Sequence, residues 1–261
     1  MKHMYYSYYL DSPLQEGRVF DVFEPETITK DTAIFMVHGG GWRSGTRTVY
    51  HKLMEAFCNL GYIVASTDYR LDAKNAFEQL SDIRESYDRF VTLLKEKGRP
   101  VRIAVHGGSA GAHLASLLVC ANPGECGESA QLRNEWVKPN SAVLQATPAD
   151  FLPWDGMMPH FWNIMQDIAG VPYDQDADAY ERLSLKNYIR SDNPPIFFME
   201  AELEYIFLPE HTQKIADAHQ SLGINSMWKV YSKMEHGFFY NLERKCQREA
   251  FEDFCAFVDA H

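Results

Sequence analysis

Ser109 is the residue of this chain whose surroundings most clearly suggest covalent chemistry. It lies between glycines in "IAVHGGSAGAHLASLLV" (103–119), where an apolar run typical of a buried strand gives way to one typical of a helix. Gly107, Ser109 and Gly111 match the pattern G-x-S-x-G, which in this context predicts a tight turn that presents the hydroxyl at the carboxyl edge of a sheet. The amide of Ala110 would be free at the helix N-terminus. Ser109 is therefore a candidate nucleophile, and a glycine-rich packing turn is the alternative.

A second glycine-rich segment, "VHGGGW" (37–42), also follows an apolar run. Backbone amides of such a loop can donate hydrogen bonds to the oxyanion that forms when a carbonyl is attacked. A phosphate-binding loop is the alternative, but no Lys-Ser or Lys-Thr pair follows. Its place roughly 70 residues before the serine turn favours an oxyanion loop.

A serine hydroxyl needs a base to become nucleophilic, and the base is normally histidine. Of the ten histidines, His236 in "MEHGFF" is the one placed on a loop after the last predicted strand, at the right end of the sheet. The base in turn needs a carboxylate that fixes its tautomer. The loop after "PPIFFM" (194–199) offers Glu200, Glu202 and Glu204, and the residues alone leave that choice open.

The elements that must position these residues alternate along the chain. Strands are predicted over 18–26, 33–37, 62–71, 101–107, 141–147, 194–202 and 225–232, and helices over 50–61, 76–98, 110–121, 209–223 and 244–261. This alternation predicts an α/β fold with a doubly wound, mostly parallel sheet and helices on both faces. The carboxyl ends of its strands would then bring the serine, the glycine loop and the histidine together.

Residues 148–193 break the alternation with several prolines and many aromatic residues. We expect a single domain over 1–261 in which 148–193 is a small lid or substrate-binding insertion, because long loops in compact domains are usually functional. An ordinary surface connection is the alternative. Six aromatic residues are predicted to form a wall around the pocket, unless most of them are core: Trp42, Trp154, Phe161, Trp162, Tyr205 and Phe238.

The composition of the chain limits the classes of partner and ligand that it is expected to bind. The formal net charge is −11, a sign that repels phosphate backbones and so argues against nucleic acid as a partner. Five irregularly spaced cysteines without a CxxC pair argue against a zinc site and fit a reducing compartment. With no visible secretory signal and no run of 18 apolar residues, we expect a cytoplasmic protein without a membrane span. The sequence leaves open whether the chain forms a homo-oligomer.

Five segments in this order, "HGGGW", "STDYRL", "GGSAG", "PPIFFMEAELEYI" and "MEHGFF", resemble the α/β-hydrolase fold. Within it, the chain is similar to the hormone-sensitive-lipase-like and feruloyl-esterase-like carboxylesterases. The resemblance implies Ser109 as nucleophile, His236 as base and Glu204 as acid, with Glu202 in reserve because the family usually has Asp there. It also implies oxyanion donors, the amides of Gly40, Gly41 and Ala110.

The implied activity is hydrolysis of a small-molecule ester, with short-chain or aryl-acyl groups and acylated carbohydrates as candidates, through an acyl-enzyme and without metal or organic cofactor. Two alternatives stay open. One is an amide hydrolase of the kynurenine formamidase type, whose pattern is also similar. The other is a binding protein that has the fold but no turnover.

Overall fold

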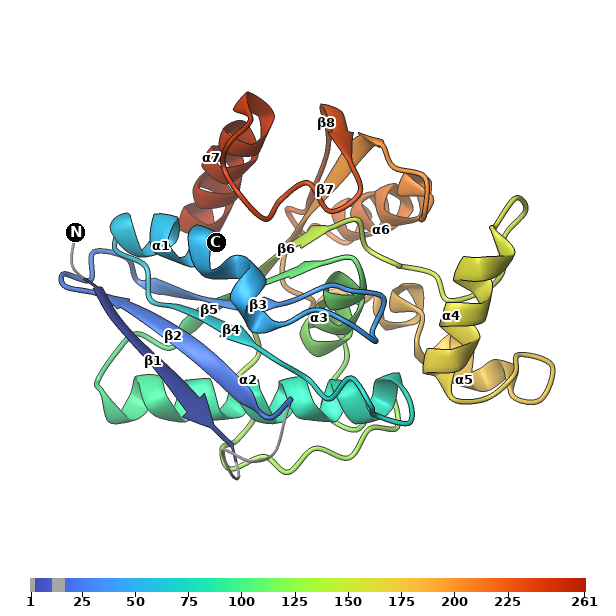
Figure 1. The fold of residues 1–261 in the computed structure, drawn as a ribbon, viewed down its shortest axis with the longest axis horizontal. Coiled ribbons are helices and arrows are strands. Elements are labelled where there is room, and N and C mark those ends of the chain that lie inside the picture. Colours follow the sequence, from blue (N-terminus) through green and yellow to red (C-terminus); the bar gives the residue numbers. More distant parts are fainter. Residues whose placement is uncertain (1–2, 11–16) are drawn as a thin grey trace.

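A computed structural model describes residues 3–10 and 17–261 (Figure 1). Eight strands form one sheet in the order β1-β2-β4-β3-β5-β6-β7-β8. The strands are β1 His3–Tyr9, β2 Val19–Pro25, β3 Thr32–Val37, β4 Val64–Thr67, β5 Arg102–Gly108, β6 Ser141–Gln145, β7 Ile196–Leu203 and β8 Met227–Glu235. β1 and β2 are antiparallel to their neighbours, and every pairing from β4 to β8 is parallel. The predicted mostly parallel sheet is confirmed.

The central strands are continuously apolar because both of their faces are covered. In β3, Phe35 and Val37 point into one hydrophobic core while Ile34 and Met36 point into the other. Alternating side chains of one strand therefore serve two cores.

Helices cover both faces of this sheet. α1 (His51–Asn59) and α7 (Lys245–Ala260) pack into one core, whereas α2 (Ala76–Glu96), α3 (Ala110–Cys120) and α6 (Pro209–Ser221) pack into the other (Figure 1). The remaining elements are α4 (Pro159–Ala169), α5 (Ala177–Arg182) and the short 3₁₀ helices η1 (Arg47–Tyr50) and η2 (Leu185–Tyr188). The segment 148–193 thus holds α4, α5 and η2, and Figure 1 shows α4 and α5 at one side of the molecule.

Several elements differ from the prediction. The sequence pattern gave no strand before residue 18, yet β1 pairs with β2 along its whole length. The strand predicted over 62–71 ends at Thr67, because the chain turns away at Asp68 to begin the loop before α2. β8 runs on to Glu235, so the loop that carries His236 starts directly at the strand end.

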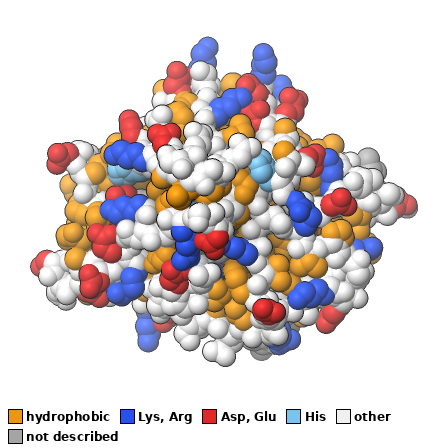
Figure 2. Space-filling model, turned by 180° about the vertical axis from the view of Figure 1, so that it is seen from behind, with side chains coloured by type: hydrophobic (Ala, Val, Ile, Leu, Met, Phe, Trp, Pro, Cys, Tyr) orange, Lys and Arg blue, Asp and Glu red, His pale blue; other side chains and the backbone are white. Residues whose placement is uncertain are grey.

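The surface of the molecule carries charged side chains of both signs. Figure 2 shows acidic and basic side chains interspersed over the face seen from behind. Within residues 3–10 and 17–261, none of the helices is long and apolar enough to cross a membrane.

Candidate active site

The turn between β5 and α3 has the predicted elbow geometry. Ser109 has φ 54° and ψ −124°, a conformation that non-glycine residues rarely adopt. Two backbone hydrogen bonds hold it there: its amide donates to the carbonyl of Gln145 (2.8 Å), and its carbonyl accepts from the amide of His113 (3.0 Å). The strained turn is thus tied to β6 on one side and to the first turn of α3 on the other.

The glycines of the elbow are required by close packing. A Cβ atom on Gly107 would lie 2.5 Å from the carbonyl oxygen of Gly111, and one on Gly111 would lie 2.2 Å from that of Val37. Either side chain would push α3 away from the strands beneath it.

The histidine loop places its imidazole against the serine. Nε2 of His236 lies 2.9 Å from Oγ of Ser109. On the other side of the ring, Nδ1 donates to Glu204, at 2.8 Å from Oε2 and 3.0 Å from Oε1. Residues from the ends of β5, β7 and β8 therefore form one continuous hydrogen-bonded series.

Glu204 is held as an anion. Its Oε1 accepts from the backbone amides of Tyr205 (3.1 Å), Ile206 (2.8 Å) and Phe207 (3.4 Å). Burial by itself would raise the pKa of Glu204, but the hydrogen bond from His236 and its electrostatic attraction, with the backbone amides, outweigh it and lower the pKa. The carboxylate therefore stays ionised where it faces the imidazole.

The two other glutamates of this loop lie elsewhere. Oε2 of Glu202 accepts from the amide of Lys233 (2.7 Å), a β8 residue with φ 59°. Glu200 is buried within β7 and accepts from Oγ1 of Thr212 (2.7 Å). Burial, aided by the charge of Glu204, raises the pKa of Glu200 to about 8 despite the hydrogen bond from Thr212. Neither carboxylate is bonded to His236.

The glycine loop lies beside the serine. Gly40 and Gly41 have φ 122° and 57°, and together with Ser109 they line one cavity. A Cβ on Gly40 would lie 2.1 Å from the carbonyl oxygen of Ser44, whereas one on Gly41 would meet nothing within 4 Å. Ala110 is the first residue of α3, so its amide has no partner within the helix. The three predicted oxyanion donors are thus grouped around Ser109.

The cavity over Ser109 has a volume of about 350 Å³ and mostly apolar walls. Of the six predicted aromatic residues, it is lined by Trp42 and Phe161. The prediction missed side chains from α4, from the loop after β7 that carries Glu204, and from the loop after β8 that carries His236: Ile164, Met165, Ile206, Phe207 and Tyr240. The spacing of Phe161, Ile164 and Met165 is the helical i, i+3, i+4 pattern, which was a usable signal in the sequence.

The other four aromatic residues do not line this cavity, which corrects the prediction. Trp162 packs against Tyr173 and Tyr180 within the segment 148–193, and Trp154 packs against Phe207 and His211. Tyr205 is 66% exposed, and Phe238 is buried beside Tyr231. Core packing and solvent exposure account for all four.

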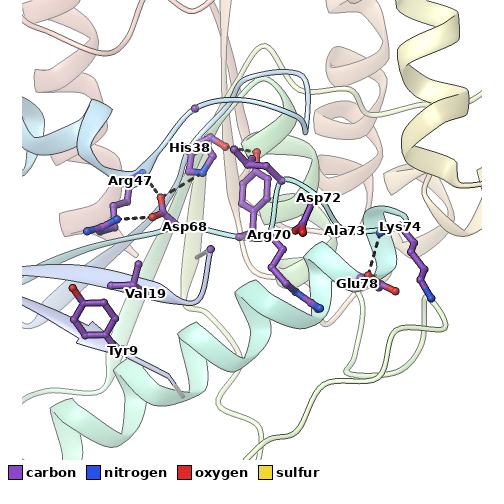
Figure 3. A pocket seen from close by; sticks show the side chains of 14 residues that line it. Tyr9, Val19, His38, Arg47, Asp68, Arg70, Asp72, Ala73, Lys74 and Glu78 are labelled. Carbon is purple, nitrogen blue, oxygen red and sulfur yellow. Dashed lines mark hydrogen bonds and ion pairs between the residues drawn. The ribbon is translucent and has the colours of Figure 1, made fainter. Parts of the chain in front are cut away.

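A larger cavity, of about 910 Å³, is lined in part by His38 (Figure 3). Of its charged side chains, Arg47 pairs with Asp68 (2.5 Å), and Glu78 accepts from the backbone amide of Lys74 (3.1 Å). Among its described lining residues there is no serine or cysteine. Although this cavity is the larger of the two, its described lining therefore offers no serine or cysteine nucleophile for a reaction.

Two solved structures share this architecture. Esterase B of Lactobacillus rhamnosis matches with a TM-score of 0.81 and 18% identity, over 99% of this chain and 85% of that one. Esterase 2 of Thermogutta terrifontis, in a structure phosphonylated by sarin, matches with a TM-score of 0.77 and 19% identity, over 92% and 88%. The strand order, the serine elbow and these similarities define an α/β-hydrolase fold.

Sequence similarity identifies the family of this chain and two related proteins. The BD-FAE family model matches residues 20–218 of the 261, and the chain belongs to the BD-FAE family. Two proteins of Mycobacterium tuberculosis are similar: "Probable carboxylic ester hydrolase LipM", 25% identical over 218 residues, and "Esterase LipQ", 27% identical over 182. The matches cover 78% and 65% of this chain but 49% and 41% of those proteins, so the chain spans about half the length of the relatives or less.

Proposed function

We propose that this chain is a serine esterase that hydrolyses carboxylic esters through an acyl-enzyme on Ser109. The observation that carries the proposal is the series Ser109 Oγ to His236 Nε2 (2.9 Å) and His236 Nδ1 to Glu204 Oε2 (2.8 Å). A nucleophile, a base and an orienting carboxylate in contact are the parts that acyl transfer needs. Similarity to proteins named as ester hydrolases supports the same activity.

The reaction follows from the positions of these groups. His236 accepts the proton of Ser109 at Nε2 as Oγ attacks the ester carbonyl, and Glu204 stabilises the imidazolium. The amides of Gly40, Gly41 and Ala110 donate to the tetrahedral oxyanion. His236 then returns the proton to the leaving alcohol, and water releases the acid by the same route. Both half-reactions balance with the ester and water, so the proposal includes no metal or organic cofactor.

The cavity favours a neutral, short or aromatic acyl group. Its described lining holds apolar side chains, and no Lys, Arg, Asp or Glu is among them. Phe161, Ile164 and Met165 belong to α4, so the segment 148–193 acts as a substrate-binding insertion in this proposal. The formamidase alternative is less well supported, because N-formylkynurenine carries an ammonium and a carboxylate that find no charged partner in this lining.

Initial rates on 4-nitrophenyl acetate, butyrate and octanoate, beside N-formylkynurenine, test the proposal. We expect ester hydrolysis by the wild type and none by Ser109→Ala. After treatment with a serine-directed organophosphonate, we expect mass spectrometry to show one phosphonate adduct on the wild type. Turnover of N-formylkynurenine with no ester hydrolysis would move the activity to the formamidase class. No turnover of any substrate and no adduct would support the binding-protein alternative.

A further inference from the structure

Trp42 has an unusual backbone for a large side chain. It follows Gly41 in the oxyanion loop, has φ 61°, and is only 2% exposed. A non-glycine residue in this region is strained and persists where its surroundings hold it. Its carbonyl accepts from Nε2 of Gln79 (2.8 Å), and its indole Nε1 donates to Nδ1 of His113 (3.2 Å).

His113 connects this tryptophan to the serine and to the insertion. It lies in the first turn of α3, where its amide donates to the carbonyl of Ser109 (3.0 Å). Its ring stacks on Phe151 (4.6 Å between centroids), and its Nε2 donates to the carbonyl of Leu183 (2.8 Å). Phe151 and Leu183 both belong to the segment 148–193.

The two hydrogen bonds fix the tautomer of His113. An indole N–H only donates, so Nδ1 must carry no proton, and a carbonyl only accepts, so Nε2 must carry one. The charged ring, with protons on both nitrogens, would lose the bond from Trp42. Complete burial lowers the pKa of His113 to about 4, so the neutral ring persists at neutral pH.

A second connection runs from the next residue of the loop. Nε of Arg43 donates to Oδ2 of Asp167 in α4 (2.7 Å), and its Nη1 donates to the carbonyls of Leu71 (3.1 Å) and Ala73 (2.5 Å). The oxyanion loop is therefore joined to the insertion by hydrogen bonds through His113 and through Arg43, besides the edge-on contact of the Trp42 ring with Phe151 (5.5 Å between centroids).

We propose that His113 is a positioning residue for the oxyanion hole: its neutral imidazole holds the indole of Trp42, and through it the amides of Gly40 and Gly41, in register with Ser109. The insertion then supports the oxyanion hole as well as the cavity wall. This inference rests on the proposed esterase function. Its physical basis is that oxyanion donors act only when they lie at hydrogen-bonding distance from the developing charge.

The test compares Trp42→Phe, His113→Phe and the double variant on 4-nitrophenyl butyrate. Trp42→Phe removes the N–H and keeps an aromatic ring, and His113→Phe keeps the stacking on Phe151. We expect each single variant to lower kcat about 10- to 100-fold with KM changed less than about threefold. The double variant should fall little below the lower single variant, because both changes remove the same hydrogen bond.

Two further variants keep the result interpretable. Trp136→Phe is the matched control, since Trp136 packs on Tyr87 outside the described lining of the cavity, and it should keep wild-type kcat. His113→Gln, which retains a donor and an acceptor, should lose less than His113→Phe. A folded Trp42→Phe with at least half of wild-type kcat, a loss confined to KM, or fully multiplicative effects would each overturn the inference. A wild type that fails to hydrolyse the ester would instead refute the proposed function.

Discussion

Glu204→Gln gives the sharpest test of the triad assignment. Three backbone amides converge on Oε1, so the amide oxygen of Gln must take that position. Its NH₂ group then occupies the position of Oε2 and faces Nδ1 of His236. Because NH₂ can only donate, it favours the tautomer in which Nδ1 gives up its proton, which moves to Nε2 and points at Ser109; only the longer contact of Nδ1 with Oε1 (3.0 Å) favours the original tautomer. The imidazole then cannot accept the proton of the serine.

The expected magnitude follows from that inversion. Trapping the base of a serine triad in the wrong tautomer costs about 10⁴ in kcat, or about 5.4 kcal/mol of transition-state stabilisation. We therefore expect kcat of Glu204→Gln on 4-nitrophenyl butyrate to fall about 10⁴-fold, with KM nearly unchanged and the urea unfolding midpoint close to that of the wild type.

Glu202→Gln is the matched control. Its amide oxygen can still accept from the amide of Lys233, so activity should stay within about threefold of the wild type. The reasoning is refuted if folded Glu204→Gln retains more than a tenth of wild-type kcat. It is also refuted if Glu202→Gln is the more damaged variant, which would return the acid role to Glu202.

The other predictions concern the loop, the cavity and a buried acid. Gly40→Ala should lower kcat at least about 10²-fold, because the methyl group displaces the loop, whereas Gly41→Ala should keep activity within about tenfold in the same assay. Phe161→Ala should raise the octanoate-to-acetate ratio of kcat/KM about tenfold by enlarging the cavity; an unchanged ratio would exclude α4 from the acyl site. Glu200→Gln should gain stability over the wild type as pH rises from 5 to 8. Folded Glu200 keeps its proton up to about pH 8 while an ordinary Glu loses it near 4.5, so the wild type loses up to about 1.4 kcal/mol per pH unit. Urea unfolding of both proteins at each pH measures this, and parallel pH profiles would show that Glu200 ionises normally in the folded state.

The sequence predicted the parts of the site that local rules control. A serine between glycines at a strand-to-helix boundary specifies an elbow, and the end of the last parallel strand identifies His236. Choosing among three glutamates was harder. Glu204 reaches the imidazole because the chain turns after β7, where the amide of Glu204 bonds back to the carbonyl of Ala201. The residues of the loop alone left the choice open, and only the resemblance of "PPIFFMEAELEYI" to the family pattern implied Glu204.

The cavity was predicted least well, for a physical reason. Aromatic residues are stabilised by packing against any suitable neighbours, and Trp162 packs against Tyr173 and Tyr180 within the segment 148–193. Burial of an aromatic ring therefore does not say which cavity it faces. β1 was missed because strand pairing at a sheet edge depends on β2, a partner that lies beyond a local sequence window.

The close approach of α3 to β3 bears on how this sequence can diverge. Backbone atoms of Val37 and His38 occupy the space that any side chain at 111 would need, so substitution there is barred whatever the residue at 109 does. The glycines of the G-x-S-x-G pattern are thus required by steric exclusion of side chains, and the serine is the one residue of the pattern that takes part in the proposed chemistry. A cysteine at 109 should keep the same backbone, so descendants of this fold can change their nucleophile while still matching the glycine pattern.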